Sequence, residues 1–284
     1  MNKIIVRKQG SYIAAIIGMV ALLGCAGPMK LAIPETFRRQ ATVEHVSGAR
    51  GNKMTAGKYT TSKIKRGVHR SYPGWNRGFL LENLLLNQVG IQKNEIVRKE
   101  KARFRYLLSG SNYPVEIYGD EKEIKKTLEY KLVNSKNDLF DSYSRLQNYN
   151  YVFSVIITGI PGEKDKPWEL LMTNLYDRKK EQDKKIITIL RPDDNGLATN
   201  GEDSIFIKPV SIRETESANG KKGKLPFKIL SGYELSMPGG GVIAIIDLIA
   251  RDIWYYNELD EKERLVVTAI STAIFARKVN DTKW

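Results

Sequence analysis

The sequence is poor in the side chains that build most metal sites and all thiol chemistry. Among its 284 residues it has one cysteine, Cys25, and two histidines, His45 and His69. A single cysteine excludes a disulfide or a redox pair within the chain. Both histidines lie in a strongly basic region, which supports neither a zinc site nor a nucleophile–histidine pair. We therefore expect no metal and no cofactor.

Long uncharged stretches are scarce as well. One near the C-terminus, residues 265–276, has twelve residues without a charge between Arg264 and Arg277. A helix of this length spans about 18 Å, well short of the roughly 20 residues that a bilayer requires. Asp260 can act as its N-cap, and Glu263 can complete a capping box. The sequence therefore predicts a helix over 265–276 that protein covers on all sides.

Two loops resemble ligand sites but lack an essential residue. Residues 238–241 are Pro-Gly-Gly-Gly, without the Gly-Lys-Ser/Thr ending of a phosphate-binding loop, and predict a hairpin turn. Residues 191–202 carry polar side chains at part of the spacing of a calcium-binding loop, but Arg191 occupies the first ligand position. We interpret the second loop as an acidic turn.

Asp247 and Asp252 flank a short apolar segment, and Arg251 lies beside them. This pattern predicts a buried ion pair at a strand end in preference to an acid–base dyad.

Positive charge, in contrast, is abundant. The formal net charge is +14, and three of these charges lie within residues 1–8, which leaves +11 for the remainder. The stretch from Arg38 to Arg77 contains ten Lys and Arg residues and one acidic residue, Glu44. Such an excess indicates an anionic partner unless it serves solubility alone. The binding residues that we expect in this region are Arg50, Lys53, Lys58, Lys63, Lys65, Arg66 and Arg70.

The first 24 residues have the composition of a secretory signal peptide, with a basic start over 3–8 and an apolar stretch over 12–23. The sequence Leu22-Leu23-Gly24-Cys25 then resembles the lipobox of bacterial lipoproteins. The resemblance implies that Cys25 is diacylated on its thiol, becomes the new N-terminus and is acylated on its amino group. Two or more acyl chains, such as palmitate, anchor a protein firmly. The alternative is an ordinary signal peptide with a stray cysteine.

The residue after the lipobox bears on localisation. Ala26 stands where an aspartate would favour inner-membrane retention in the enterobacterial sorting rule, so we expect the outer membrane and leave its periplasmic or surface face open. Residues 25–40 have no convincing periodicity and predict a tether. Residues 41–284 are then expected to form one globular domain, whose N-terminal part, 41–77, is basic.

Most of this domain has the alternating pattern of β-strands, separated by turn residues and charged connections. A short helix is predicted at 81–89, and a charged interruption at 120–126. Parallel strands would need crossover helices, which the pattern lacks, so we expect an antiparallel meander. The predicted fold class is mainly β (α+β), an antiparallel barrel or sandwich of about ten strands around the C-terminal helix. The predicted strands are 102–108, 115–117, 128–132, 151–158, 168–175, 185–190, 204–212, 226–229, 233–237, 242–248 and 253–256.

About ten strands followed by a buried last helix, over roughly 95–279, resembles the tubby-like and phospholipid-scramblase-like fold. In that fold a closed barrel is threaded by its hydrophobic C-terminal helix. No family motif stands at matching positions, so the resemblance implies a layout and no functional residue.

These observations favour a non-catalytic envelope lipoprotein with a binding or structural role. Its basic region would face lipid headgroups, peptidoglycan or lipopolysaccharide. Nucleic acid is a less favoured partner, because no nucleic-acid-binding motif accompanies the basic residues. The alternative is an envelope enzyme, hydrolase-like, whose site is assembled from residues far apart in sequence, since a missing motif is weak evidence in β folds.

Overall fold

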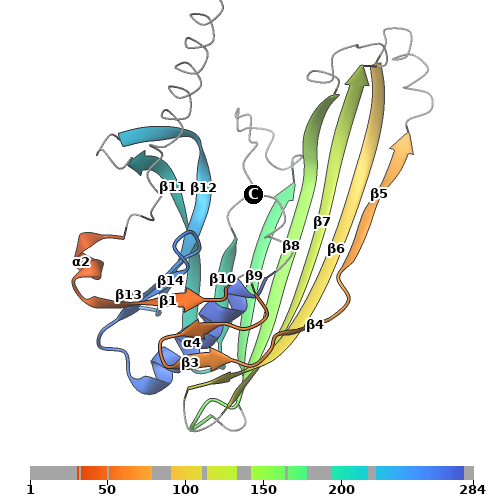
Figure 1. The fold of residues 1–284 in the computed structure, drawn as a ribbon. Helices are drawn as coiled ribbons and strands as arrows, with labels where there is room; N and C mark the ends of the chain where they lie inside the picture. The colour runs from red at the N-terminus through yellow and green to blue at the C-terminus, as the bar shows by residue number, and fades with distance from the viewer. Residues whose placement is uncertain are drawn as a thin grey trace, which may run out of the picture.

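The computed structural model describes residues 31, 33–49, 51–78, 91–110, 114–132, 142–163, 166–177, 194–216 and 222–277 (Figure 1). Cys25, Arg50, the helix predicted at 81–89 and the strand predicted at 185–190 lie outside these residues. The helices are α2 (Glu35–Arg38) and α4 (Glu261–Phe275). The strands are β1 (Ala41–Ser47), β2 (Thr55–Ala56), β3 (Tyr59–Thr61), β4 (Lys65–Arg66), β5 (Arg70–Gly78), β6 (Ile91–Ser109), β7 (Val115–Leu132), β8 (Ser142–Thr158), β9 (Trp168–Asp177), β10 (Asn195–Thr199), β11 (Ser204–Glu216), β12 (Lys222–Ser236), β13 (Val242–Asp247) and β14 (Asp252–Tyr256).

Twelve of the strands form a closed antiparallel barrel, which confirms the predicted β-rich fold. Around the ring the order is β1, β14, β13, β12, β11, β10, β9, β8, β7, β6, β3 and β2. The ring closes where β3 pairs with β6, with Thr60 opposite Ser109. Outside the ring, β4 and β5 continue along the same edge of β6. The expected number of about ten strands was close, but β1, β2, β3, β4, β5 and β10 were not among the predicted segments.

The interruption predicted at 120–126 is wrong, because these residues lie in the middle of β7. This strand runs for 18 residues between β6 and β8, and all of 120–126 pair with both neighbours. Glu121 and Glu123 are buried on the inner face of the barrel, whereas Lys122 is exposed on the outer face. A charged stretch therefore continues the strand, since its side chains alternate between two different environments. Likewise, the segments predicted at 226–229 and 233–237 belong to one strand, β12.

The connection between β12 and β13 is the hairpin turn that the sequence predicted. The backbone N–H of Gly240 donates to the carbonyl oxygen of Met237 at 3.2 Å. Gly239 has a φ of 68°, a left-handed conformation that glycine adopts without steric cost.

The last part of the expected tether packs onto the barrel. Leu31 and Phe37 are buried in a small cluster with Ile212 of β11 and Ile245 of β13. The segment from residue 31 onward is therefore fixed to the barrel wall.

The helix α4 begins as predicted. The backbone N–H of Glu263 donates to Asp260 Oδ1 at 2.7 Å, and the backbone N–H of Asp260 donates to Glu263 Oε2 at 2.9 Å. This capping box satisfies two N–H groups that the first helical turn leaves without helical partners.

The barrel encloses α4, in which all residues from Leu265 to Phe275 are buried, as is the C-cap residue Ala276. Tyr106 of β6 donates its hydroxyl to Thr272 Oγ1 at 2.9 Å. From another side of the ring, the hydroxyl of Tyr255 in β14 lies 2.9 Å from Thr268 Oγ1. The threonines thus give the buried helix polar partners on two walls. Among the described residues, no helix has the length and apolar character needed to cross a membrane.

Candidate anionic-surface interface

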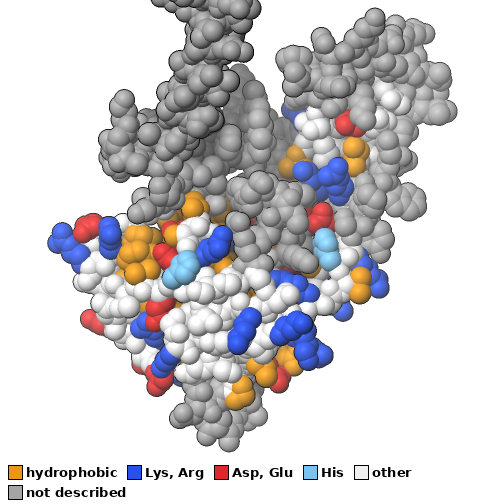
Figure 2. Space-filling model, in the orientation of Figure 1, with side chains coloured by type: hydrophobic (Ala, Val, Ile, Leu, Met, Phe, Trp, Pro, Cys, Tyr) orange, Lys and Arg blue, Asp and Glu red, His pale blue; other side chains and the backbone are white. Residues whose placement is uncertain are grey.

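Besides Lys58, four of the cations expected to bind an anionic surface are exposed. Lys53 lies before β2, Lys63 precedes β4, Lys65 begins β4, and Arg70 begins β5. Figure 2 shows Lys and Arg side chains gathered at the lower right of the view, over the region of β3, β4 and β6.

Two other expected cations are engaged within the protein and hold the ends of α4. Lys58 forms an ion pair with Glu261 in the first turn of the helix. At the other end, Arg66 is half-buried and donates through Nη1 to the carbonyl oxygen of Ala276 at 2.6 Å. A cation at a helix C-terminus is favoured by the negative end of the helix dipole. We therefore assign Lys58 and Arg66 to stabilising the fold.

Sequence reasoning missed a row of cations on the long strand β6. Lys101, Arg103 and Arg105 are exposed there and alternate with buried apolar residues. The alternation was visible in the sequence, but nothing in it showed which strands would lie beside β6. We define the basic face as the following exposed cations on β6 and beside it: Lys63, Lys65, Arg70, Lys101, Arg103, Arg105 and Lys122.

The strand register places cations of the basic face directly opposite one another. Arg105 of β6 is opposite Lys65 of β4. Lys101 of β6 is opposite Arg70 of β5 on one side and Lys122 of β7 on the other. Like charges in directly opposite positions of a sheet are destabilising. The strands β4, β5, β6 and β7 therefore present a cluster of positive charge that the sheet itself does not favour.

Little negative charge offsets this arrangement. Asp120 of β7 lies 2.6 Å from Arg103 Nε and 4.0 Å from Lys101 Nζ. Within the described ranges, no ion pair joins the other five cations of the basic face. The positive potential of this surface is thus available to a partner.

A second polar cluster is buried where α4 ends. The guanidinium of Arg277 places Nη1 3.2 Å from Asp194 Oδ2 and donates from Nη2 to the hydroxyl of Tyr233 at 2.8 Å. Tyr233 donates to the same carboxylate at 3.0 Å, and Asn174 Nδ2 donates to its other oxygen at 2.7 Å. Burial raises the pKa of Tyr233 far above its ordinary value. Because the charges are mutually paired, this cluster ties α4 to three strand regions.

The enzyme alternative would need a catalytic site, and the buried polar groups next to this cluster come nearest to one. Glu121 and Glu123 are buried on β7, and each has a partner. The hydroxyl of Tyr151 on β8 is buried without a hydrogen-bond partner, and burial raises its pKa. Within the described residues, the Tyr151 hydroxyl therefore has no hydrogen-bonded base beside it.

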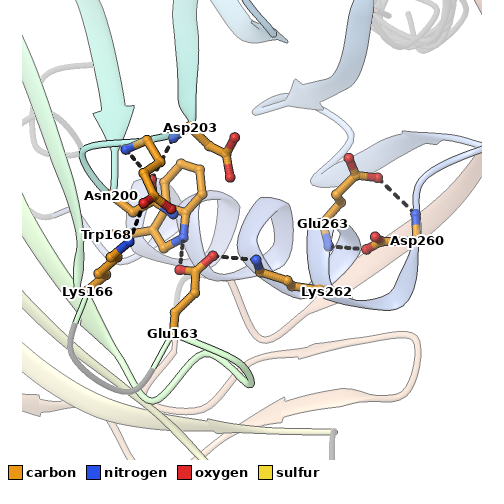
Figure 3. Close-up of polar contacts among 9 residues, drawn as sticks. Glu163, Lys166, Trp168, Asn200, Asp203, Asp260, Lys262 and Glu263 are labelled. Carbon is orange, nitrogen blue, oxygen red and sulfur yellow. Dashed lines mark hydrogen bonds and ion pairs between the residues drawn. The ribbon is translucent and has the colours of Figure 1, made fainter.

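Polar contacts also tie the loop that contains Glu163 to the start of α4, and others order the loop at 200–203 (Figure 3). Glu163 accepts a hydrogen bond from Trp168 Nε1 at 2.7 Å and lies 2.6 Å from Lys262 Nζ, and this contact raises the pKa of Lys262. The side chain of Asn200 accepts backbone N–H groups of the two residues that follow Gly201, at 3.0 and 2.7 Å. The pattern at 191–202 is not one loop, because residues 195–199 form β10.

The ion pair predicted for Arg251 is wrong, because no ion pair joins Arg251 within the described ranges. Instead, Asp247 and Asp252 lie directly opposite each other across β13 and β14. Asp247 accepts two backbone N–H groups of the following turn, at 2.8 and 2.9 Å, and burial raises its pKa. Asp252 lies 2.8 Å from Nδ1 of His45. Arg251 has a φ of 63° in the turn between the two strands.

Both histidines have a carboxylate neighbour that only the fold brings close. Besides the contact of His45 with Asp252, Nε2 of His69 lies 3.7 Å from Glu100. Within the described part of the chain, no three His, Cys, Asp or Glu side chains are grouped so that they could hold a metal ion.

Comparisons with protein-family models, with curated proteins and with solved structures find no match to this chain, so its function is inferred from its residues and their arrangement.

Proposed function

We propose that this protein is a membrane-anchored bacterial envelope lipoprotein with a non-catalytic role at an anionic surface. The anchor is Cys25, acylated at the lipobox, and the binding surface is the basic face. The observation that supports the proposal most is the like-charge register of the basic face, in which Arg105 is opposite Lys65 and Lys101 lies between two further cations.

An anionic surface would remove the repulsion that this register creates. Each Lys or Arg near an anionic membrane surface contributes about 1 kcal/mol of attraction, which corresponds to about fivefold in Kd. Exposed charges interact over about 10 Å at 0.1 M salt and over about 3 Å at 1 M. Binding through the basic face should therefore be strong at low salt and weak at high salt.

Direct binding measurements test the proposal. The full chain carrying Cys25→Ser, which has no acyl anchor, is mixed with anionic vesicles, lipopolysaccharide or peptidoglycan over a salt series. Removing Lys65 and Arg105 together (Lys65→Gln, Arg105→Gln) should weaken binding by roughly 25-fold at low salt, at about fivefold per cation.

The matched control is the double variant Arg145→Gln, Lys208→Gln, which removes two exposed cations elsewhere. Its net charge equals that of the first double variant. It should retain most of the binding, because neither residue belongs to the basic face. Equal losses in the two double variants would show that only net charge matters. Binding that does not depend on salt, or no binding to any of the three surfaces, would refute the proposal.

A further inference from the structure

The segment that leads to the proposed anchor and the basic face are on opposite sides of the barrel. Leu31 packs with residues of β11 and β13, and a Cβ on Gly232 of β12, which lies between them, would meet its side chain at 3.1 Å. In the twelve-strand ring, β12 is six strands from β6 in either direction. In Figure 1, α2 and β12 accordingly lie at the left, and β5 and β6 at the right.

The chain between Cys25 and Leu31 is too short to run round the barrel. Six fully extended residues span at most about 20 to 22 Å. Twelve strands about 4.8 Å apart give a circumference of at least about 58 Å, half of which is about 29 Å before strand tilt and side chains widen it. We call the chain between Cys25 and Leu31 the linker. Leu31 is only 7% exposed and packs on the barrel wall, so the linker can become longer only if Leu31 detaches from the wall.

Resting on the proposed lipid anchor, we infer that the basic face is turned away from the bilayer that holds Cys25 and binds a carboxylate-bearing cell-wall polymer of the peptidoglycan type. The protein would then bridge its own membrane and the polymer layer in front of it. The short linker favours this partner over the headgroups of the same bilayer, because it does not let the basic face lie against that bilayer.

The layout of the basic face suits an extended polyanion. On β6, Lys101, Arg103 and Arg105 are two residues apart, which places successive cations about 7 Å apart along the strand. Partners on the neighbouring strands, Lys65 on one side and Lys122 on the other, widen the row to about 10 Å. A linear chain with repeated carboxylates can meet several of these cations at once, and such multivalent contacts add in avidity.

The test uses the lipidated full chain in vesicles that contain anionic phospholipid and a brominated lipid quencher. Since the one native thiol is acylated, a cysteine introduced by Leu107→Cys beside Arg105 is the only free thiol and carries a fluorophore. A matched label at Lys208→Cys lies on β11, next to β12. We expect the Leu107→Cys label to show no quenching by the lipid, and less quenching than the Lys208→Cys label.

The same vesicles are then mixed with soluble peptidoglycan fragments, or with the same fragments after amidation of their carboxylates. The intact fragments should bind and change the emission of the Leu107→Cys label, whereas the amidated fragments should bind at least tenfold more weakly. Equal binding of the two preparations, or no binding of either, would overturn the assignment of the partner.

A longer linker tests whether the linker length keeps the basic face away from the bilayer. Inserting ten Gly/Ser residues after Pro28 should let the basic face reach the anionic bilayer, so the Leu107→Cys label should become quenched. Quenching of this label with the native linker, or no quenching with the extended linker, would overturn the inference. These outcomes differ from failure of the proposed function, in which the chain is not acylated or the removal of Lys65 and Arg105 changes binding to no anionic surface.

Discussion

Arg277 and Asp194 form an ion pair inside the barrel, with Arg277 Nη1 3.2 Å from Asp194 Oδ2, although 83 residues separate them in the sequence. Both side chains are no more than 5% exposed. The hydroxyl of Tyr233 bridges the two groups, and Nε of Arg277 donates to the carbonyl oxygen of Ile274 at 3.2 Å. The pair therefore fixes the C-terminal end of α4 against the strands that surround it.

Replacing Arg277 by Met should lower the free energy of unfolding by about 3–5 kcal/mol, because it leaves the carboxylate of Asp194 buried without its cation. Guanidinium unfolding of the purified variant measures the loss. Adding Asp194→Asn to Arg277→Met should recover part of it, since the unpaired charge is then removed. A loss below about 1 kcal/mol in the single variant would show that the pair does not hold the helix.

The core of α4 is tested at Ile270, which has no solvent exposure. Replacing Ile270 by Ala should cost about 2–5 kcal/mol in lost transfer free energy and cavity formation. Ile270→Asp should give no cooperative melt, because it buries a charge without a partner. The matched control is Val68→Ala at a side chain that is 80% exposed, where we expect a change within about 0.5 kcal/mol. Similar effects at both positions would contradict an enclosed helix.

Stability should depend on pH through Asp247, whose pKa is raised in the folded protein chiefly by burial. In the unfolded chain its pKa is about 3.9, so the folded state holds the proton more tightly. The contribution of Asp247 to the free energy of unfolding is fully present below its unfolded-state pKa. It is lost as the pH rises through its folded-state pKa. Because Asp247→Asn removes this titration, its stability relative to the parent should increase from pH 4 to pH 7, as measured by thermal unfolding. A difference that stays constant over this range would contradict the prediction.

Lipidation is tested at Cys25 itself. Labelled palmitate should be incorporated into the expressed protein, and Cys25→Ser should abolish the label and shift the protein out of the membrane fraction. Two or more acyl chains anchor a protein firmly, so loss of the label and loss of the membrane association are expected together. Unchanged fractionation of the variant would refute the anchor.

The sequence predicted α4 well because its signals are local: the cap Asp260, its partner Glu263 and an uncharged run lie within one short segment. It did not predict that Glu121 and Glu123 belong to a strand interior, since the burial of a charge depends on partners that folding supplies. The basic face was predicted only in part for a similar reason. Forty residues separate Lys65 from Arg105, and only the strand register places them opposite each other.

The closure of the barrel also constrains the order in which the protein can fold. The first strand of the ring, β1, pairs with its last, β14, and α4 follows β14 in the chain. Contacts of such large sequence separation make folding slow, because the entropy of loop closure opposes them before they contribute stability. Until synthesis reaches α4, the inner face of the β6 to β11 meander has no helix to cover it. A chain in which α4 has not yet docked therefore exposes an apolar sheet surface, which favours aggregation.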